Sequence, residues 1–459
     1  QPPTVTGLSP LTTLASGGHA VGWNTGTKIV ASDKAVNDYF GYSADMSSDG
    51  TKVIVGSVYD DTPGYPDSGA AYIYTYSGGS WDAGTKIVAE ASDRAASDYF
   101  GKDVSISGDG TKVIVGAHYE DPGGTADAGA AYIFTYDGSS WDTGTKIQAS
   151  DKAANDQFGY SVSMSSDGTK VIVGAKFGDA PSTWASGCAY IFTYSGSSSS
   201  WDAGTKIVAS DTASSDQFGW SVAISGDGTK AIVGASYEDT AHTDAGSAYI
   251  FTYSNGSWFP GTKIVASEPG SSPHASDYFG SSVSMNSDGT KVIVGATHED
   301  GGPASPLNNA GAAYIYTYSG SSWDAGTKIV ASDTASGDQF GSSVAMSSDG
   351  TKVIVGAGFE DAGGSAAGAA YIYTYSGSSW DTGTKIVASD AQASDYFGSG
   401  YSSSVSMSSD GTKVIVGAYG EDPDGTTDAG AAYIFDYLAT ELFDTSTQVF
   451  TATGTGIVS

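Results

Sequence analysis

The sequence predicts an all-β protein, a seven-bladed β-propeller whose blades are four-stranded and antiparallel. Two observations lead to this prediction. Three markers, Phe-Gly, Asp-Gly-Thr-Lys and Gly-Thr-Lys-Ile, recur at matching places in seven successive repeats of about sixty residues. Between the markers, apolar residues alternate with a period of two, and no segment of ten residues shows a helical period. Radial closure of such units removes the long sheet edges that would otherwise invite aggregation.

Each repeat predicts four strands in a fixed order. The first is short and alternating, as at 161–164, and the second is apolar on both faces, as at 112–115, which places it inside stacked sheets. The third alternates, as at 71–76, and the fourth begins at Gly-Thr-Lys-Ile. The Asp-Gly between the first two strands predicts a two-residue type I′ turn, in which both central residues have positive φ.

The repeated aromatic residues are predicted to pack the blades. We expect each phenylalanine of a Phe-Gly pair to lie between two blades and its glycine to allow a close backbone turn. Tyrosines such as Tyr72, Tyr74 and Tyr76 leave two interpretations open: sheet packing, or an exposed row that stacks on sugar rings or on another subunit. The seven phenylalanines are Phe40, Phe100, Phe158, Phe218, Phe279, Phe340 and Phe397.

The phase of the repeat predicts how the ring closes. The first Gly-Thr-Lys-Ile strand, at 26–32, precedes the first Phe-Gly, whereas the last repeat, at 403–437, lacks a fourth strand. We therefore expect residues 26–32 to complete the last blade. The predicted organisation is a propeller at 23–437 between two tails, 1–22 and 438–459.

Composition excludes several functions. The 51 acids and 19 basic residues give a formal net charge of −32, which opposes binding to the phosphates of nucleic acid. A single cysteine, Cys188, excludes a disulfide framework and a thiolate zinc site. No apolar run is long enough to span a bilayer. A chain that begins at Gln1 is expected to be a mature form from which a secretion signal has been removed.

The motifs Phe-Gly, Val-Ile-Val-Gly-Ala and Gly-Ala-Ala-Tyr-Ile, repeated over 26–437, resemble the FG-GAP repeats of integrin-α propellers. The resemblance implies an extracellular propeller used for adhesion or ligand binding, without catalysis. The sequence agrees that it is not an enzyme: it shows no nucleophile elbow and no phosphate-binding loop, and its five histidines fall at non-equivalent places. Integrin-like repeats often carry a calcium loop, but here Asp49 and its equivalents stand in a short Asp-Gly turn and are expected to form turns.

Carboxylates gather in two kinds of loop that a propeller places on one face, the second–third loops and the crossovers between blades. We expect most lysines near the opposite face, so the molecule should be polarised. Two interpretations are open: a solvated acidic surface, or Ca²⁺ held at the blade junctions by loop carboxylates. The calcium candidates are Asp60, Asp61, Asp67, Glu120, Asp121, Asp127, Glu238, Asp239, Asp244, Glu421, Asp422 and Asp428.

Two functions follow as hypotheses. The first is a secreted structural or adhesion protein that assembles into a filament or surface layer through its tails, by strand addition to a neighbouring copy. The alternative is a monomeric, calcium-dependent propeller that binds cell-surface ligands or glycans. Asn255, in Asn-Gly-Ser, is the predicted N-glycosylation site.

Overall fold

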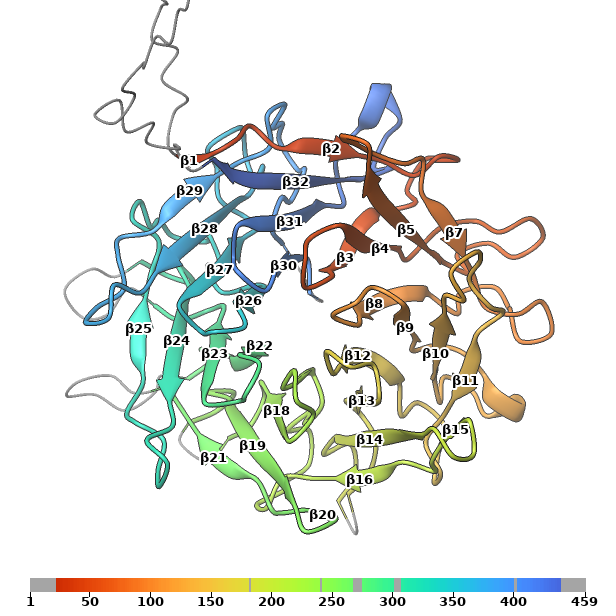
Figure 1. The fold of residues 1–459 in the computed structure, drawn as a ribbon. Helices are drawn as coiled ribbons and strands as arrows, with labels where there is room; N and C mark the ends of the chain where they lie inside the picture. The colour runs from red at the N-terminus through yellow and green to blue at the C-terminus, as the bar shows by residue number, and fades with distance from the viewer. Residues whose placement is uncertain are drawn as a thin grey trace, which may run out of the picture.

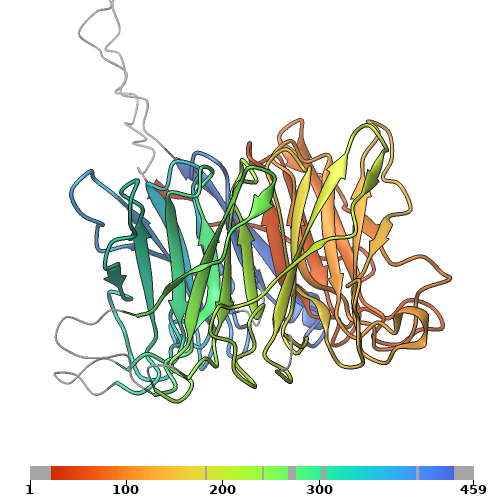
Figure 2. The same cartoon turned by 90° about the horizontal axis from the view of Figure 1, so that it is seen from below.

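The computed structural model describes residues 22–180, 183–239, 242–266, 275–300, 307–399 and 403–438. These residues form seven antiparallel sheets around a central axis, which confirms the predicted propeller (Figure 1). Inner strands such as β3 (Phe40–Met46), β8 (Phe100–Ile106) and β12 (Phe158–Met164) surround the central opening. Seen from the side, the strands run between two faces of the ring (Figure 2).

The first four blades follow one another along the chain, each from its inner to its outer strand. The first blade contains β3, β4 (Lys52–Ser57), β5 (Ala70–Ser77), β6 (Ser80–Trp81) and β7 (Thr85–Ile87), and the second contains β8, β9 (Lys112–Ala117), β10 (Ala130–Thr135) and β11 (Thr145–Ile147). The third contains β12, β13 (Lys170–Ala175), β14 (Cys188–Ser195), β15 (Ser200–Trp201) and β16 (Thr205–Ile207), and the fourth contains β17 (Ser221–Ile224), β18 (Lys230–Ala235), β19 (Ser247–Ser254), β20 (Ser257–Trp258) and β21 (Thr262–Ile264).

The remaining three blades repeat the pattern. The fifth contains β22 (Phe279–Met285), β23 (Lys291–Ala296), β24 (Ala312–Thr317) and β25 (Thr327–Ile329), and the sixth contains β26 (Val344–Met346), β27 (Lys352–Ala357), β28 (Ala369–Thr374) and β29 (Thr384–Ile386). The seventh contains β30 (Val405–Met407), β31 (Lys413–Ala418) and β32 (Ala431–Leu438), joined by β1 (Gly22–Trp23) and β2 (Thr27–Ile29). Two 3₁₀ turns, η1 (Pro122–Gly124) and η2 (Pro423–Gly425), lie in second–third loops.

The core is divided among the seven interfaces between blades. Ile54 and Ile73 of the first blade pack in one cluster with Phe100 and Val113 of the second, and Phe100 is fully buried. Each of the other six clusters likewise contains one Phe-Gly phenylalanine with residues of two neighbouring blades, so the predicted role of these phenylalanines is confirmed. Gly101 has φ +93°, and a Cβ there would lie 2.3 Å from the carbonyl oxygen of Ala70, so only glycine fits.

The ring closes as the sequence predicts. Strand β2 pairs with β32 in the register Thr27–Ile434, Lys28–Tyr433 and Ile29–Ala432. Strand β1 extends this pairing, with Gly22 opposite Leu438. The first described residues of the chain therefore form the outer strand of the last blade.

The predicted type I′ turn is wrong. In the first repeat, the amide of Gly50 donates to the carbonyl of Ser47 (2.9 Å), and Gly50 has φ +65° while Asp49 does not have positive φ. One carboxylate oxygen of Asp49 accepts hydrogen bonds from the amide and hydroxyl of Thr51 (2.9 and 2.8 Å). This side-chain turn lets Asp keep an ordinary backbone conformation, so only the glycine has to adopt positive φ. Asp49 is a turn former, as predicted.

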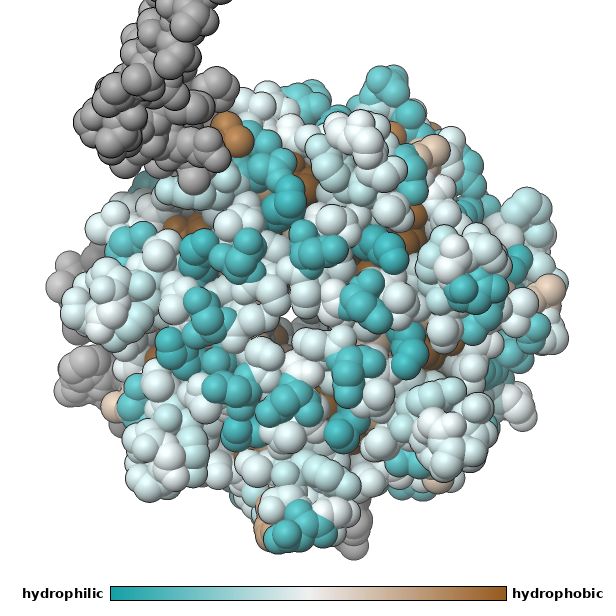
Figure 3. All heavy atoms as spheres, viewed as in Figure 1, coloured by the Kyte–Doolittle hydropathy of each residue, from teal (hydrophilic) through white to brown (hydrophobic). Residues whose placement is uncertain are grey.

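The inner strands line a central cavity of about 180 Å³. Its apolar lining comes mainly from two positions of the inner strand in each repeat, so equivalent side chains surround the axis. Figure 3 shows hydrophilic side chains repeated around a narrow central opening. One position holds Met46, Ile106, Met164, Ile224, Met285, Met346 and Met407, and the other holds Ala44, Val104, Val162, Val222, Val283, Val344 and Val405.

Candidate binding face

The crossovers between blades and the second–third loops meet on one face of the ring, which we call the loop face. The amide of Asn37, in a crossover, donates to the carbonyl of Thr427, in a second–third loop (3.0 Å). The amide of Tyr59 similarly donates to the carbonyl of Asp38 (3.3 Å). The predicted grouping of these acidic loops is therefore confirmed.

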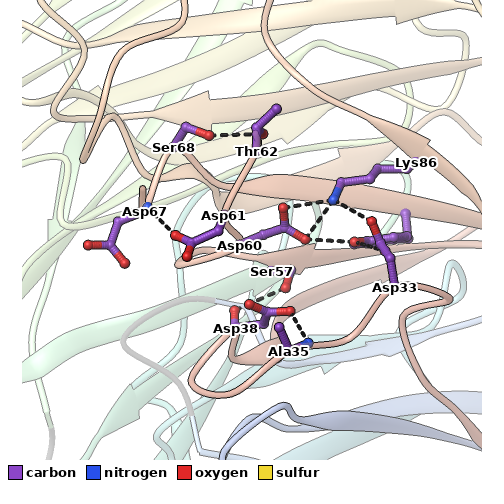
Figure 4. Close-up of polar contacts among 11 residues, drawn as sticks. Asp33, Ala35, Asp38, Ser57, Asp60, Asp61, Thr62, Asp67, Ser68 and Lys86 are labelled. Carbon is purple, nitrogen blue, oxygen red and sulfur yellow. Dashed lines mark hydrogen bonds and ion pairs between the residues drawn. The ribbon is translucent and has the colours of Figure 1, made fainter. Parts of the chain in front are cut away.

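Seven lysine–carboxylate clusters hold the loop face together. In the first, the Lys86 ammonium lies 2.7 Å from Asp60 and 2.8 Å from Asp33, which belongs to the crossover (Figure 4). The hydroxyl of Tyr72 lies 2.6 and 2.7 Å from the same two carboxylates. Partial burial alone would raise the pKa of Asp33, but hydrogen bonds from Lys86 and Tyr72 hold that pKa below its ordinary value.

These lysines correct the predicted charge distribution. Lysines of the outer strands reach the acidic loops, whereas those of Asp-Gly-Thr-Lys stay near the opposite hairpins, where Lys52 donates to the carbonyl of Gly110 in the next blade (2.9 Å). The prediction that most lysines lie away from the acidic face is thus wrong for half of the repeated ones, because each outer strand is short and its lysine extends along the sheet. The outer-strand lysines are Lys28, Lys86, Lys146, Lys206, Lys263, Lys328 and Lys385.

The calcium candidates fall into three structural roles. The first acid of each loop is buried and bonded to an outer-strand lysine: these are Asp60, Glu120, Glu238 and Glu421. The second acid is exposed and accepts the amide of the third within the same loop: these pairs are Asp61–Asp67, Asp121–Asp127, Asp239–Asp244 and Asp422–Asp428. The third acids adopt positive φ, and their carbonyls accept the amide of the residue that precedes the next Phe-Gly.

The hydrogen bonds and ion pairs of these loop acids affect whether a calcium ion can bind between them. A lysine ammonium already neutralises each of the buried first acids. Among the described residues, no three His, Cys, Asp or Glu side chains are grouped closely enough to share a metal ion. The carboxylates present therefore do not form a ready calcium site, and calcium binding stays a prediction.

The single cysteine replaces one such acid. In the third blade, Gly178 stands where other loops have the first acid, and a Cβ on Gly178 would lie 2.4 Å from the Sγ of Cys188. Cys188 is fully buried, with Sγ 3.7 Å from the Tyr190 hydroxyl. The thiol thus occupies part of the space that a carboxylate fills in the other blades.

In a second set of crossover aspartates, the pKa is raised above its ordinary value, in contrast to that of Asp33. The carboxylate of Asp156 accepts the amide of Ala153 (2.7 Å), a contact that caps the crossover. Burial raises the pKa of Asp156 to about 6 and of Asp98 to about 7, with nearby carboxylates adding to the effect. The pKa values of four equivalents are also raised: Asp38, Asp216, Asp338 and Asp395.

We expect the free energy of unfolding to rise as the pH falls from about 7 to about 5. In this range the folded chain binds more protons than the unfolded chain, because six buried aspartates have raised pKa values. Burial lowers the pKa values of His118, His298, Lys102 and Lys176, and these four groups oppose the trend, the two lysines only near pH 7. Urea unfolding across this range measures the slope, and Asp98→Asn should reduce it. A stability that increases with pH in this range would contradict the assignment.

A chain of aromatic side chains, which we call the aromatic belt, follows the loop face around the axis from the sixth blade through the seventh and first to the fifth. Its members come from the residue before Phe-Gly, from the one after it, and from the loop that follows the second strand. Consecutive ring centroids lie between 4.7 and 5.8 Å apart, and most rings are half-buried. In order of contact, the belt contains Phe359, Tyr396, Tyr419, Tyr39, Tyr59, Tyr99, His118, Tyr160, Trp220, Tyr237, Tyr278 and His298.

The belt borders a cleft of about 510 Å³ between the first three blades, which we call the mouth cleft. Tyrosine rings form much of its lining, and two of the predicted loop acids, Asp121 and Asp127, lie at its edge. Two lysines and a histidine also line it. The aromatic and charged lining residues are Tyr42, Tyr59, Tyr99, Tyr119, Tyr160, Asp98, Asp121, Asp127, Lys102, Lys176 and His118.

Sequence reasoning missed the belt and the cleft. It treated the aromatic rows of the third strand as the candidates, but Tyr72 and Tyr74 are fully buried and only Tyr76, 39% exposed, reaches the rim. A signal for the belt was present: aromatic residues precede Phe-Gly in four repeats and follow Val-Ile-Val-Gly in most. Asn255 lies exposed in the hairpin between β19 and β20, where its glycosylation stays a prediction.

Seven closed blades with a lined cleft on the loop face define a propeller of the ligand-binding or adhesion type. A family model described as FG-GAP repeat matches seven segments: 23–74, 81–134, 141–192, 201–251, 258–316, 323–373 and 380–435. The chain belongs to the FG-GAP repeat family, whose members are typically extracellular or surface proteins and generally not enzymes. A search of curated proteins finds no match. No helix within the described ranges is long and apolar enough to cross a membrane.

Proposed function

We propose that this chain is an extracellular, non-enzymatic binding propeller that holds a saccharide ligand in the mouth cleft. The observation that supports the proposal is the combination of half-buried tyrosine rings and loop carboxylates around one concave site. The apolar C–H face of a sugar ring packs on tyrosine, and carboxylate oxygens accept hydrogen bonds from sugar hydroxyls. A concave site with aromatic walls and a few placed polar groups is the common form of a small-ligand site.

One pair of loops in the cleft supplies both an aromatic ring for the face of a sugar and a carboxylate for its hydroxyl groups. The Tyr119 ring lies 5.2 Å from Tyr99 and 4.2 Å from His118, so its orientation is fixed by neighbours. Asp121 is exposed, and one of its oxygens holds the loop by accepting the amide of Asp127 (2.8 Å). Its second oxygen is then available to a ligand without loss of the loop structure.

We expect Tyr119→Ala to weaken saccharide binding about tenfold, which corresponds to about 1.4 kcal/mol. The matched control is Tyr237→Ala, because Tyr237 occupies the same repeat position in the fourth blade but does not line the cleft. Asp121→Asn should also weaken binding, whereas Asp239→Asn, its equivalent outside the cleft, should not. Glycan-array screening followed by calorimetry measures these effects. Equal losses from both members of each pair would place the ligand elsewhere.

Calcium dependence is a finer version of the same proposal. Since lysines hold the first acids, a cation would have to use the exposed second acids and the third acids of each loop, such as Asp121 and Asp127. Binding measured with millimolar calcium and with a chelator tests this. Equal affinity under both conditions contradicts calcium dependence and leaves the saccharide proposal in place.

Self-assembly through the terminal tails is the second candidate function. The pairing of Gly22 with Leu438 brings both ends of the described chain to one point on the closing blade, so two tails would leave the ring together. Residues 1–21 and 439–459, the proposed joints, lie outside the described residues. Negative-stain microscopy of the full chain and of a variant without these segments tests the idea. Filaments that vanish with the tails support it, and single discs from both proteins contradict it.

A further inference from the structure

Two grooves at the rim of the ring, which we call the rim grooves, lie outside the mouth cleft. One, of about 690 Å³, lies between β25 of the fifth blade and the β28–β29 hairpin of the sixth. The other, of about 610 Å³, lies between β7 of the first blade and the β10–β11 hairpin of the second. Both volumes fall within the range of about 300–1,000 Å³ that is usual for ligand sites. Figure 1 shows the two junctions on opposite sides of the ring.

An aromatic pair from the hairpin lines each rim groove. Tyr375 and Trp380 are cross-strand partners in the sixth blade, and their ring centroids lie 5.4 Å apart. Tyr136 and Trp141 form the same pair in the second blade, also at 5.4 Å. All four side chains are half-buried. The pair recurs in the other five blades, as Trp23–Tyr437, Tyr76–Trp81, Tyr194–Trp201, Tyr253–Trp258 and Tyr318–Trp323.

The fold does not use the polar atoms of these two aromatic pairs. Within the described ranges, the indole N–H groups of Trp380 and Trp141 form no hydrogen bond, and solvent reaches both. The same holds for the hydroxyl groups of Tyr375 and Tyr136. An indole N–H only donates, whereas a phenolic hydroxyl both donates and accepts. Each pair therefore offers a ligand flat apolar rings together with unused donors and an unused acceptor.

A lysine from the preceding blade holds the tyrosine of each pair in place. The Nζ of Lys291 lies 5.3 Å from the ring centroid of Tyr375 and donates to the carbonyl of Gly350 (2.8 Å). Lys52 is placed equivalently, with its Nζ 5.2 Å from the Tyr136 centroid. Because these contacts fix the ring before a ligand arrives, binding costs less ordering of the wall.

The rest of the lining supplies an acceptor and an apolar surface. One oxygen of Asp381 fixes the hairpin by accepting the amides of Thr374 (3.1 Å) and Gly383 (3.0 Å). Asp381 is exposed, and no described residue donates a hydrogen bond to its second oxygen. Asp142 is bonded in the same way in the second blade. Across the larger groove, Val330 of the fifth blade is 43% exposed.

We propose that the two rim grooves bind a neutral linear polysaccharide with flat, β-linked sugar rings. The apolar C–H face of such a ring packs on tryptophan and tyrosine, while the free indole N–H, hydroxyl and carboxylate oxygen bond its hydroxyl groups. The net charge of −32 and the exposed aspartate in each groove oppose an anionic polymer. This inference does not rest on the mouth cleft, because the two kinds of site share no lining residue.

The position of the grooves makes one ring at least bivalent. Since the two sites face opposite sides of the rim, a single molecule holds two polysaccharide chains, or two places on a flexible one. Two linked sites raise the overall affinity for a polymer well above that of either site. A polymer should therefore bind more tightly than a short oligosaccharide of the same linkage.

The test is hydroxyl-radical footprinting of the full chain with and without cellohexaose, read by mass spectrometry. Trp184 is the internal reference, because it is 74% exposed and lies in neither groove. We expect the oxidation rates of Trp141 and Trp380, relative to Trp184, to fall about twofold or more, since a stacked sugar covers the indole. Maltohexaose, whose α-linked chain is twisted, should protect these two residues less.

Variants provide a second measurement, in native gels that contain hydroxyethyl cellulose. The polymer should slow the unmodified chain and the Trp184→Ala variant equally. A double Trp141→Ala, Trp380→Ala variant should be slowed less. Because both tryptophans also pack against blade cores, a double Asp142→Asn, Asp381→Asn variant, which keeps an oxygen for each hairpin, provides a milder change in the same direction. Carboxymethyl cellulose, the anionic counterpart, should slow the unmodified chain less than the neutral polymer.

The outcomes separate this inference from the proposed function. Protection of Tyr119 without protection of the rim tryptophans would place the saccharide in the mouth cleft alone and overturn the rim sites. Protection of the rim tryptophans without Tyr119 supports the rim sites and counts against the mouth cleft. If neither is protected and no polymer slows the chain, the rim inference is overturned, and the glycan array still decides the mouth cleft. Protection that rises with protein concentration in the absence of sugar would assign the grooves to a second copy of the chain.

Discussion

Replacement of Phe100 by alanine is expected to lower the free energy of unfolding by about 3–5 kcal/mol, since it removes a fully buried aromatic ring and leaves a cavity. The ring packs edge-on to Phe134, with centroids 6.0 Å apart, in the cluster that joins the first two blades. The glycine that follows cannot move to fill the space, because its backbone lies against Ala70. Urea unfolding monitored by fluorescence and by circular dichroism measures the loss.

The matched control is Phe259→Ala. Phe259 follows the β19–β20 hairpin and is 49% exposed, so its removal should change stability by less than about 0.5 kcal/mol. A Phe100 variant as stable as the Phe259 variant would mean that the interface repacks or that Phe100 does not join the blades. Separate unfolding transitions in the two signals would show that one interface can open while the rest of the ring remains folded.

The second large effect concerns the lysine that closes the ring. Lys28 of β2 lies 2.6 Å from Glu421 and 2.9 Å from Asp390, and Glu421 is only 2% exposed. Removing one partner of a buried ion pair leaves the other charge without compensation. Because Lys28 keeps some contact with solvent, we expect Lys28→Met to cost about 2–3 kcal/mol, at or below the lower end of the range for fully buried pairs.

Lys34→Met provides the comparison on the same segment. Lys34 pairs with Asp424, whose side chain is 86% exposed, so its loss should be close to neutral. Denaturation midpoints of the two variants, measured at one pH and ionic strength, test the difference. If both variants unfold at the same midpoint, the Lys28 cluster does not stabilise the closure, and backbone pairing of β2 with β32 alone holds the ends together.

Much of the fold could be predicted because the same sequence signals recur in all seven repeats. The alternation of apolar residues, the buried second strand and the position of each Phe-Gly follow from local patterns, and each was confirmed by the burial of the corresponding residues. The turn after Ser47 was predicted wrongly because Asp-Gly suits two loop lengths. The side chain of Asp49 selects the longer one by bonding Thr51, an interaction that a dipeptide signal does not contain.

The site was less predictable than the fold. Sequence reasoning chose Asp121 and Asp127 for their charge, and both line the mouth cleft. It did not bring Lys102 and His118 of the second blade together with Lys176 of the third, because residues of different repeats meet only in the cleft between the blades. Likewise, it placed Lys86 on the wrong face, because a strand boundary does not show which way a long side chain extends.

The sequence by itself determined the number of blades, their strand order and the closure by residues 26–32, since these depend on period and phase along the chain. The tertiary structure alone decided which charges neutralise one another and which side chains share a cleft. Ion pairing and ring contacts depend on distances of a few ångströms between residues that lie far apart in the sequence, such as Lys86 and Asp60, 26 positions apart, or Lys28 and Glu421, 393 positions apart. Such distances are fixed by the curvature of the closed ring, which no single repeat contains.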